Sequence, residues 1–418
     1  SAQLRVLRAS LDELANQHCA AKMGKGPPAD QGSLKGLVSE VEQMLPSLQE
    51  AELLEGNMLI GSGWHMLGKD DLALEPLLRV AQAPRGMAPL NDQLIASLVV
   101  LPMLRRSGNW LQVLQVADQA YKLADGLWAD VALPFLRGVA LARLGRPAEA
   151  AASLEQALEM NPALRQAYLE FDQVATVLRD FERCRRVAQK LVDQGSYWRN
   201  CWQRPLHFYA GAGDSSQDLT SRPWHDPADF ALARCLEASA AVIMREFQAL
   251  STGQERWGRV GSSDRGNENS SHDADLVAAG EWSELVLLGD APNSAENCSR
   301  CPETALLLRG FEEVAQCAEM TLGECLFSRL VPGTRLRPHC GPSNMRLTCH
   351  LGLDIPEGCE ITCGGVSRAW EQGKCLVFDD SFEHEVWHRG NAARTVLLVN
   401  FWHPDIPASR RRELMKEL

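Results

Sequence analysis

The sequence predicts a two-part α + β protein, in which an N-terminal solenoid of α-helical repeats precedes a C-terminal domain with a double-stranded β-helix (jelly-roll) fold. Two observations carry this prediction. Apolar residues recur in a 34-residue frame through the first half of the chain, as in helical pairs that bury their faces by stacking on one another. From residue 281 onward, short apolar runs alternate with Gly and Pro turns, which is the pattern of a jelly roll.

Composition shifts divide the chain into four parts. Helical periodicity over residues 1–22 ends at the breaker-rich "MGKGPPADQGS", and a second helix is predicted over 34–50. The stretch "RNCWQRPLHFYAGAGDSSQDLTSRP" carries Gly, Ser and Pro without helical period. We therefore predict an N-terminal helix and linker at 1–33, a helical repeat domain at 34–200, a linker at 201–219 and a β domain at 220–418.

The clearest repeat spans residues 131–164 and includes "GRPAEAAASLEQALEMNP", which resembles a tetratricopeptide repeat. The positions that helix-on-helix packing requires to be small or large carry suitable residues, namely Gly138, Leu141, Gly145, Ala150, Leu154, Ala157 and Pro162. The same frame fits 54–87, 94–127 and 165–198 more loosely. Such repeats form either a rigid support or a groove for a peptide or partner protein.

The β domain is predicted to begin with a helix and a loop. "PADFALARCLEASAAVIMREFQAL" reads as one amphipathic helix that covers a sheet. The polar stretch at 251–275 reads as a mobile surface loop. Strands follow in "SELVLL", "ECLFSRL", "MRLTCHLGL", "KCLVF" and "RTVLLVNF".

Two histidines lie at the ends of such strands, His339 in "RPHCGPSN" and His384 in "FDDSFEHEVW". Both are expected at the rim of the β domain, where a metal ion can be bound from two strands. Non-haem iron oxygenases use two histidines and one carboxylate, which commonly stands two residues after the first histidine. That position is Gly341 here, so the sequence offers two ligands and an open position.

The segments "HCGPSNMRLTCHLGLDIPEGCEITC", "WEQGKCLVFDDSFEHEVWH" and "FWHPDI" resemble the catalytic domain of the aspartyl/asparaginyl β-hydroxylase family, and the similarity covers roughly residues 220–405. That family uses Fe(II), 2-oxoglutarate and dioxygen, and it binds iron with two histidines and no protein carboxylate. Gly341 therefore matches the family. Tetratricopeptide repeats precede the oxygenase domain in the aspartyl hydroxylases too.

The resemblance assigns His339 and His384 to the iron. It assigns Ser328 and Arg394 to the distal carboxylate of 2-oxoglutarate and His350 to its other carboxylate. An arginine suits this role because its planar guanidinium binds a carboxylate with two parallel hydrogen bonds.

The same resemblance makes Asp380 an acid near the metal that orients a bound water. Period-two alternation in "MRLTCHLGL" puts Arg346, Thr348 and His350 on one strand face, and Leu347, Cys349 and Leu351 on the other. In the aspartyl hydroxylases that resemble this chain most, the positions of Arg346 and Thr348 are both arginines implicated in receiving the substrate's acidic group. Thr348 removes one cation and favours a neutral target such as Asn.

These assignments predict a dioxygenase that hydroxylates an Asp- or Asn-type side chain of a protein or peptide. Two alternatives stay open: a lipid or small-molecule hydroxylase of the same wider family, and a repeat-based binding module with an inactive oxygenase core. An anion at the open position beside Gly341 would permit halogenation instead of hydroxylation.

A net charge of −12 and an isoelectric point near 5.4 argue against a nucleic-acid partner or an anionic membrane surface, which require clustered Lys and Arg. The apolar run "LIASLVVLPML" is too short to span a bilayer and fits a buried helix. The chain begins with Ser1, which leaves an upstream anchor or targeting segment open. The resemblance points the same way, because family members are often anchored in the endoplasmic reticulum membrane.

The chain contains 13 cysteines. Cys298-x-x-Cys301 and Cys359-x3-Cys363 together match the spacing of a zinc site, although no histidine completes it. In the family, a cysteine at the position of Cys298 is disulfide-bonded to one that is Ala305 here. A bridge from Cys298 is therefore expected to reach another cysteine, for example Cys301.

Overall fold

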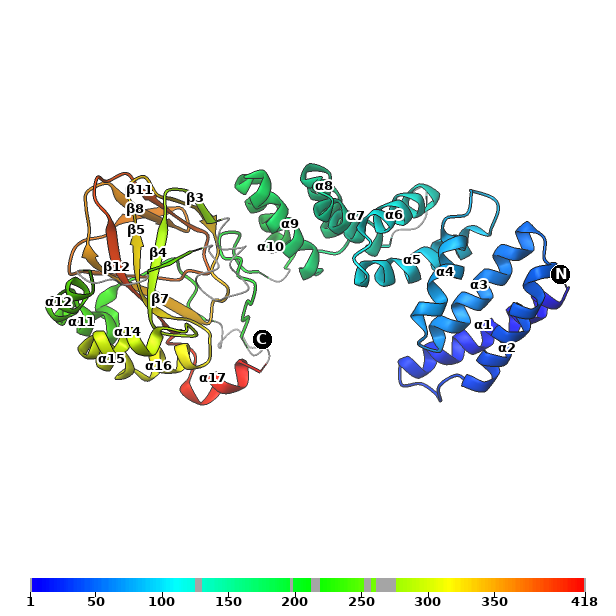
Figure 1. Ribbon diagram of the computed structural model, residues 1–418, viewed down its shortest axis with the longest axis horizontal. Helices are drawn as coiled ribbons and strands as arrows, with labels where there is room; N and C mark the ends of the chain where they lie inside the picture. The colour runs from blue at the N-terminus through cyan, green and yellow to red at the C-terminus, as the bar shows by residue number, and fades with distance from the viewer. Residues whose placement is uncertain are drawn as a thin grey trace. The chain divides into compact units, whose positions relative to one another are not determined.

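The computed structural model describes residues 2–124, 130–195, 198–211, 219–251, 257–260 and 276–416. The chain forms two compact units, Ser1–Cys184 and Arg185–Leu418. The first is helical and the second contains the β-sheets (Figure 1). The division falls inside a helix and therefore precedes the linker expected at 201–219. Most of the loop predicted at 251–275 lies outside the described residues.

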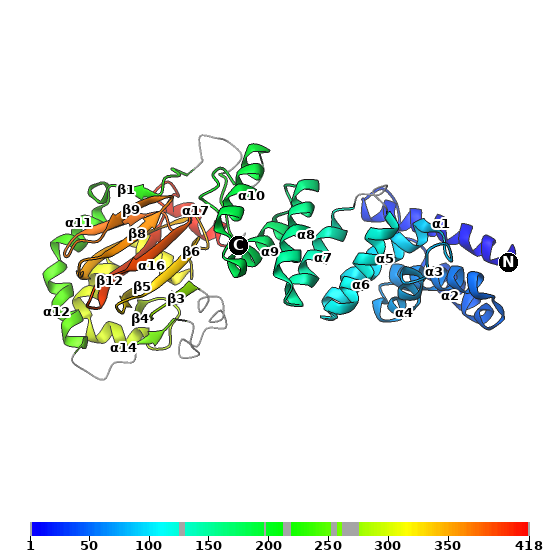
Figure 2. The ribbon, with the colours of Figure 1, turned by 90° about the horizontal axis from the view of Figure 1, so that it is seen from above.

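The helical unit consists of consecutive helices joined by short turns (Figures 1 and 2). Each of the four predicted repeat frames covers most of one helical pair, although the first helix begins four residues before the frame at 54–87 and at 94–127. The helices are α1 (Ala2–Lys22), α2 (Gln31–Met44), α3 (Glu50–Met66), α4 (Asp70–Ala81), α5 (Leu90–Arg106), α6 (Trp110–Ala124), α7 (Ala132–Arg143), α8 (Pro147–Met160), α9 (Arg165–Leu178) and α10 (Phe181–Asp193), with a 3₁₀ turn at Leu45–Ser47.

The second helix begins earlier than the predicted residue 34 and ends before residue 50. The side chain of Asp30 caps its first turn by accepting a hydrogen bond from the Ser33 backbone N–H at 2.7 Å. The helix α2 then passes into the 3₁₀ turn, which contains Pro46, and α3 starts at Glu50. The predicted first helix is confirmed as α1, and the apolar run considered above lies within α5, where most of its residues are buried or half-buried.

Two repeats pack their helices in the same way. A Cβ atom added to Gly138 of α7 would lie 2.6 Å from Cγ of Leu154 in α8, and one added to Gly61 of α3 would lie 2.4 Å from Cγ of Leu77 in α4. No real Cβ fits at such distances, so both positions require glycine. The two contacts also span the same sequence separation. This packing bears out the small-residue positions that the repeat frame predicted.

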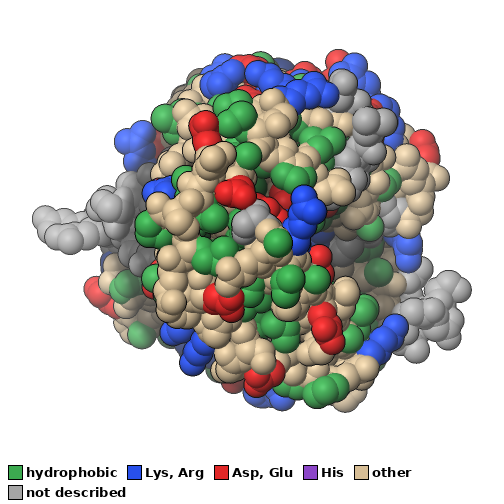
Figure 3. Space-filling view, turned by 90° about the vertical axis from the view of Figure 1, so that its right-hand side faces the viewer, with side chains coloured by type: hydrophobic (Ala, Val, Ile, Leu, Met, Phe, Trp, Pro, Cys, Tyr) green, Lys and Arg blue, Asp and Glu red, His purple; other side chains and the backbone are tan. Residues whose placement is uncertain are grey.

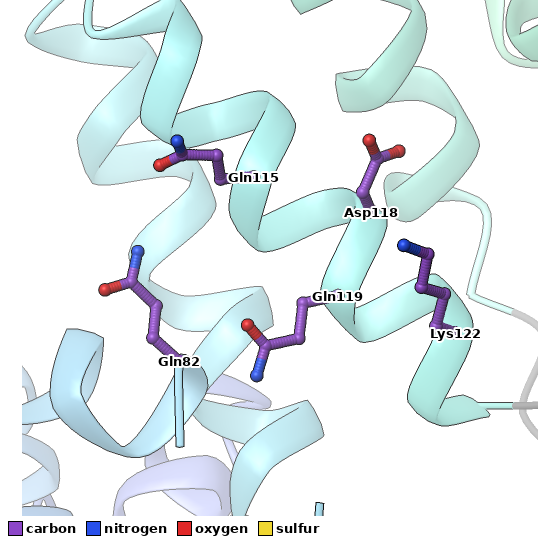
Figure 4. A pocket seen from close by; sticks show the side chains of 5 residues that line it. All are labelled: Gln82, Gln115, Asp118, Gln119 and Lys122. Atoms are coloured by element: carbon purple, nitrogen blue, oxygen red, sulfur yellow. The ribbon is translucent and has the colours of Figure 1, made fainter. Parts of the chain in front are cut away.

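The helical unit also carries a polar pocket of about 480 Å³. Four of its residues follow one side of α6, and the fifth, Gln82, comes just after α4 (Figure 4). They are Gln82, Gln115, Asp118, Gln119 and Lys122. The face of the molecule in Figure 3 carries acidic and basic side chains interspersed with hydrophobic ones.

The second unit contains two antiparallel sheets. Their orders are β1-β10-β7-β12-β5-β4-β2 and β3-β6-β11-β8-β9 among the described strands. The strands are β1 (Trp224–His225), β2 (Gly258–Arg259), β3 (Val277–Ala279), β4 (Trp282–Leu288), β5 (Cys325–Leu330), β6 (Arg335–His339), β7 (Arg346–Asp354), β8 (Cys359–Cys363), β9 (Val366–Ala369), β10 (Cys375–Phe378), β11 (His384–His388) and β12 (Arg394–Trp402).

Helices cover one face of the seven-stranded sheet. Phe247 of α12, for example, packs on Phe327 of β5 with ring centroids 5.3 Å apart. The predicted single amphipathic helix is in fact two, because the helix breaks at Ser239. The helices of this unit are α11 (Ala231–Ala238), α12 (Ala240–Ser251), α14 (Ser294–Arg300), α15 (Pro302–Arg309), α16 (Glu312–Glu319) and α17 (Ala408–Leu414), with a 3₁₀ turn at Pro227–Asp229.

The strand β7 separates two cores, as its alternation predicted. Its residues Leu347, Cys349 and Leu351 belong to the core beneath the helices. His350 points the other way and meets Phe378, which belongs to a second core that both sheets share. Hydrophobic side chains from both sheets build this second core, including Leu330, Leu336, Ile361, Phe378, Val386 and Val396.

The cysteine predictions are not supported. The thiol of Cys298 donates to the Leu287 carbonyl at 2.9 Å and forms no disulfide, so the expected bridge to Cys301 is wrong. A zinc site is excluded by position, because Cys298 and Cys301 lie in the core beneath the helices whereas Cys359 and Cys363 lie in the core between the sheets. In the described part of the chain, no helix has the length and apolar character needed to cross a membrane.

Candidate active site

His339 and His384 lie side by side in the five-stranded sheet. His339 ends β6 and His384 begins β11, and because these strands are antiparallel the two residues are direct register partners. Their ring centroids are 4.1 Å apart. The fold therefore brings together two histidines that stand far apart in the sequence.

The backbone determines which nitrogen of each ring carries the proton. Nδ1 of His339 lies 2.7 Å from the Arg337 carbonyl oxygen, and Nδ1 of His384 lies 2.9 Å from that of Phe382. A carbonyl only accepts, so Nδ1 is the donor and Nε2 holds the lone pair in both neutral rings. Burial lowers the pKa of His384, which favours this neutral form. Neutral imidazoles with Nδ1 bonded to a carbonyl are typical metal ligands.

The carboxylate of Asp380 lies against Gly341. A Cβ atom at Gly341 would come within 2.7 and 2.8 Å of the two carboxylate oxygens. The space that a carboxylate from position 341 would use is therefore taken by Asp380. One oxygen, Oδ2, accepts from Arg346 Nη2 at 2.7 Å, whereas the buried Oδ1 has no hydrogen-bond partner among the residues that the structure describes. A buried carboxylate oxygen of this kind requires a donor such as a bound water.

Arg394 is a buried cation without a carboxylate partner among the described residues. Its guanidinium stacks over the Trp370 ring at 4.5 Å, and its Nη1 makes one long hydrogen bond of 3.4 Å to the Ser328 carbonyl. Its buried Nε has no hydrogen-bond partner within the described ranges. Burial lowers the pKa of Arg394 to about 10, so the group is still charged at neutral pH. A buried charge is stable only when paired, which points to an anionic ligand.

His350 presents a second donor beside Arg394. The indole N–H of Trp370 donates to Nδ1 of His350 at 3.3 Å, so the proton of this imidazole is on Nε2. That Nε2 is buried and has no acceptor in the part of the chain that the structure describes. Burial, together with the charge of Arg394, lowers the pKa of His350 well below its usual value. His350 is therefore a neutral N–H donor with an unmet hydrogen bond.

Ser328 completes this group from β5. It is buried, and its Oγ accepts a hydrogen bond from the Trp282 indole at 3.1 Å. Because the oxygen is used as an acceptor, the hydroxyl hydrogen is directed elsewhere. The three residues assigned to the cosubstrate thus carry donors, as a dicarboxylate requires.

The predicted substrate residues Arg346 and Thr348 both have partners inside the protein. Arg346 is ion-paired with Asp380 and also donates to the Leu322 carbonyl. The hydroxyl of Thr348 accepts from the side-chain amide of Asn400 at 2.9 Å, across the β7–β12 pair. Arg346, the cation that remains on this strand face, is therefore already neutralised by Asp380.

Trp370 and Asn400 were missed by the reasoning from sequence. Trp370 contacts both Arg394 and His350, and Asn400 holds Thr348. A tryptophan after a strand is more often a core residue than a site residue, and nothing in the pattern pairs position 400 with 348. Only the register of the sheet makes these contacts visible.

Asp379, the neighbour of Asp380, is a fully buried acid. Its Oδ1 accepts from the backbone N–H and the hydroxyl of Ser381, and its Oδ2 accepts from the Gln203 side-chain amide at 2.9 Å. Burial outweighs these hydrogen bonds and raises the pKa of Asp379 to about 8. The folded state therefore favours the protonated acid.

The expected consequence is a pH-dependent stability. Because its pKa is raised in the folded state, Asp379 stabilises the folded protein fully below pH 4, where it is protonated in both states. This contribution to the free energy of unfolding is lost as the pH rises toward 8. Asp379→Asn cannot ionise, and rotation of the Gln203 amide accommodates the new NH₂ group. The melting temperature of the variant minus that of the parent should rise by several degrees between pH 5 and pH 9, as scanning calorimetry will show. A difference that is constant over this range would contradict the protonated assignment.

The geometry defines a candidate metal centre of two neutral histidines, with an acid on one side and a group of anion-directed donors on the other. In the part of the chain that the structure describes, no three His, Cys, Asp or Glu side chains converge as metal ligands.

Residues 237–404 match the model of the aspartyl/asparaginyl beta-hydroxylase family. The chain is 34% identical over 229 residues to an aspartyl/asparaginyl beta-hydroxylase of Mus musculus, which covers 54% of this chain and 28% of that protein. It is 32% identical over 236 residues to aspartate beta-hydroxylase domain-containing protein 2 of Xenopus tropicalis, and the match covers 55% of this chain and 59% of that protein. This part of the chain is therefore similar in sequence to the aspartyl/asparaginyl beta-hydroxylases.

The chain spans only about a quarter of the mouse relative and just over half of the Xenopus one. Among solved structures, MamA aligns with 45% of this chain and 98% of its own at 18% identity and a TM-score of 0.32. A score at this level does not establish a shared fold.

Proposed function

We propose that this protein is an Fe(II)- and 2-oxoglutarate-dependent dioxygenase that hydroxylates an Asp- or Asn-type side chain of a protein or peptide. The observation that carries the proposal is the pair of neutral histidines with Nδ1 bonded to the backbone, beside a buried arginine with no carboxylate partner among the described residues. The match of residues 237–404 to the family model and the hydroxylase names of the relatives support it.

The residues present fit the metal and the cosubstrate. His339 and His384 would hold Fe(II) through Nε2, and Asp380 would hold a water through its unpartnered Oδ1. Arg394 and Ser328 would bind the distal carboxylate of 2-oxoglutarate, and the Nε2–H of His350 would bind the other. When bound, Fe(II) with 2-oxoglutarate and dioxygen supplies the oxidising power to hydroxylate an unreactive C–H bond, with release of carbon dioxide and succinate.

The protein's own contribution is to orient these groups and exclude water. The carbonyls of Arg337 and Phe382 hold the two imidazoles in one tautomer. Trp370 fixes the orientation of His350 and covers one face of the Arg394 guanidinium. Both Arg394 and His350 are buried, so their hydrogen bonds to a carboxylate form in a low-dielectric site, where such bonds are strong.

The strand order supports a jelly-roll assignment for the oxygenase domain. Among the strands from β5 to β12, one sheet contains the neighbours β10-β7-β12-β5 and the other the neighbours β6-β11-β8-β9. The chain thus alternates between the two sheets along most of this stretch, as in a double-stranded β-helix. The equivalent glycine packing in two repeats supports a tetratricopeptide-like solenoid, which favours a protein substrate over a lipid or small molecule.

The proposed function is tested by mixing the protein with Fe(II) and 2-oxoglutarate without oxygen and then adding peptides under air. A metal-to-ligand charge-transfer band should form, followed by succinate and a hydroxylated peptide. No band and no succinate would leave the binding-module alternative. If a lipid or a small molecule increases succinate formation and none of the peptides does, the lipid or small-molecule alternative is favoured. A chloride-dependent chlorinated product would establish halogenation.

Thr348 is the position where we expect the substrate preference to differ from that of the aspartyl hydroxylases. Arg346 is already paired with Asp380, and Thr348 presents a hydroxyl held by an amide, so this strand face suits a neutral Asn better than an acidic Asp. Thr348→Arg should raise turnover of Asp-containing, epidermal-growth-factor-like peptides relative to their Asn counterparts, by roughly tenfold for one charge-assisted contact.

Thr348→Val is the matched control, because it keeps the volume and removes only the hydroxyl. It should weaken Asn peptides without gaining Asp peptides. Equal Asp and Asn turnover in the parent and in both variants would show that this strand face does not read the substrate.

A further inference from the structure

Most of the stretch expected to be a linker at 201–219 is packed on the candidate site. Residues 198–211, which include all but one of the described residues of that stretch, belong to the second unit and are called the strap segment below. The side chains of Trp198, Gln203 and Arg204 in this segment are all at least 90% buried. A flexible linker would expose such residues, so the strap segment is part of the β unit.

The strap segment contacts both loops that lead to the two histidines. On the side of His339, the backbone N–H of His207 donates to the Pro342 carbonyl at 2.8 Å. The Asn344 side chain and the backbone of Tyr209 exchange two hydrogen bonds of 2.8 and 3.0 Å. On the side of His384, the backbone N–H of Glu383 donates to the Trp202 carbonyl at 2.6 Å.

Glu383, which immediately precedes His384, is clamped by two arginines. Its Oε1 accepts from Nη1 of Arg185 and its Oε2 from Nη2 of Arg204, both at 2.6 Å. Arg185 also stacks on the Trp202 ring at 4.9 Å. The carboxylate is only 5% exposed, so both of its oxygens are paired in a low-dielectric environment where such bonds are strong.

We propose that Glu383 is a positioning residue for the metal centre, in which Arg185 and Arg204 hold its carboxylate and thereby hold the backbone that orients His384 and Asp380. The inference rests on the proposed function and adds the strap segment to the site. Both carboxylate oxygens and the backbone N–H of Glu383 are tied, which leaves the adjoining His384 little freedom to rotate. Groups that hold metal ligands in this way typically change metal affinity tenfold to a hundredfold when removed.

The test measures Mn(II) binding to the full chain by electron paramagnetic resonance, with 2-oxoglutarate present and no turnover required. Glu383→Gln keeps the size and removes the charge, and it should weaken the Mn(II) Kd by roughly tenfold to a hundredfold. Glu383→Asp keeps the charge and should recover part of this loss. The matched control is Glu170→Gln in the helical unit, where Glu170 also binds an arginine, Arg143, through both oxygens and lies far from the site in sequence. Its Kd should equal that of the parent.

The outcomes separate the two proposals. If the parent binds Mn(II) no better than a His339→Ala/His384→Ala variant, the proposed function fails. If the parent binds and a folded Glu383→Gln variant binds within twofold of it, the positioning role is overturned. If Glu383→Gln does not fold, the Mn(II) Kd of Arg185→Met tests the positioning role. This variant should fold, because Arg185 is 29% exposed and Arg204 still binds the carboxylate after its loss. A weaker Kd in that variant at an unchanged melting temperature supports the role, and an unchanged Kd refutes it.

Discussion

His339→Ala and His384→Ala should each abolish 2-oxoglutarate-dependent succinate formation. The two imidazoles are the only histidine pair that the described residues place in adjacent register with both Nδ1 atoms bonded to backbone carbonyls. Because no third ligand converges on them among the described residues, loss of either ring would leave the proposed Fe(II) with one imidazole. We expect succinate formation to fall to the uncatalysed background, because the proposed metal would carry the chemistry.

The control for these variants is His65→Ala. His65 lies in α3 of the helical unit and binds Asp70 at 2.8 Å, so it tests the loss of a hydrogen-bonded histidine that has no place in the centre. It should retain parental succinate formation. Retained turnover in the His339→Ala/His384→Ala double variant would refute the metal assignment, provided circular dichroism shows it folded.

Arg394→Ala should weaken 2-oxoglutarate binding by roughly tenfold to a hundredfold. The guanidinium is 2% exposed and has no carboxylate partner among the described residues, so its charge is available to the cosubstrate. Losing a charge-assisted contact costs about 1.5–3 kcal/mol, which corresponds to that range of affinity. Titration of 2-oxoglutarate under anaerobic conditions, followed by the charge-transfer band, measures the change.

Arg411→Ala provides the comparison, because Arg411 is also buried and also lies over a tryptophan, Trp402, at 5.9 Å. Its Nη1 donates to the side chain of Gln316 at 2.9 Å, and neither residue is assigned to the site. Its 2-oxoglutarate affinity should match that of the parent. An unchanged affinity in Arg394→Ala, or an equal loss in both variants, would refute the role of Arg394.

Local sequence patterns predicted the elements that depend on local physics. The glycine at position 138 follows from helix contact within one repeat, and the alternation in β7 follows from the two-residue period of a strand. Both were confirmed. The predictions that were wrong concern breaks and partners: the helix split at Ser239, the start of α2 at Gln31, and the bridge at Cys298. Helix ends and the partners of thiols depend on contacts of individual side chains, and the hydrophobic periodicity of a sequence does not predict such contacts.

The sequence alone determined the residue types of the candidate site: two histidines at strand ends, a third histidine, an arginine and an aspartate, in segments that resemble one family. Tertiary structure decided their states. The strand register places His339 beside His384, and burial leaves Arg394 without a carboxylate partner among the described residues. Asp380 lies so close to Gly341 that a carboxylate side chain at position 341 has no room. The tertiary structure also turned an expected linker into the strap segment that holds Glu383. The reason is physical: the chemical type of a side chain is local, but its charge state and orientation depend on neighbours that only the folded chain brings into contact.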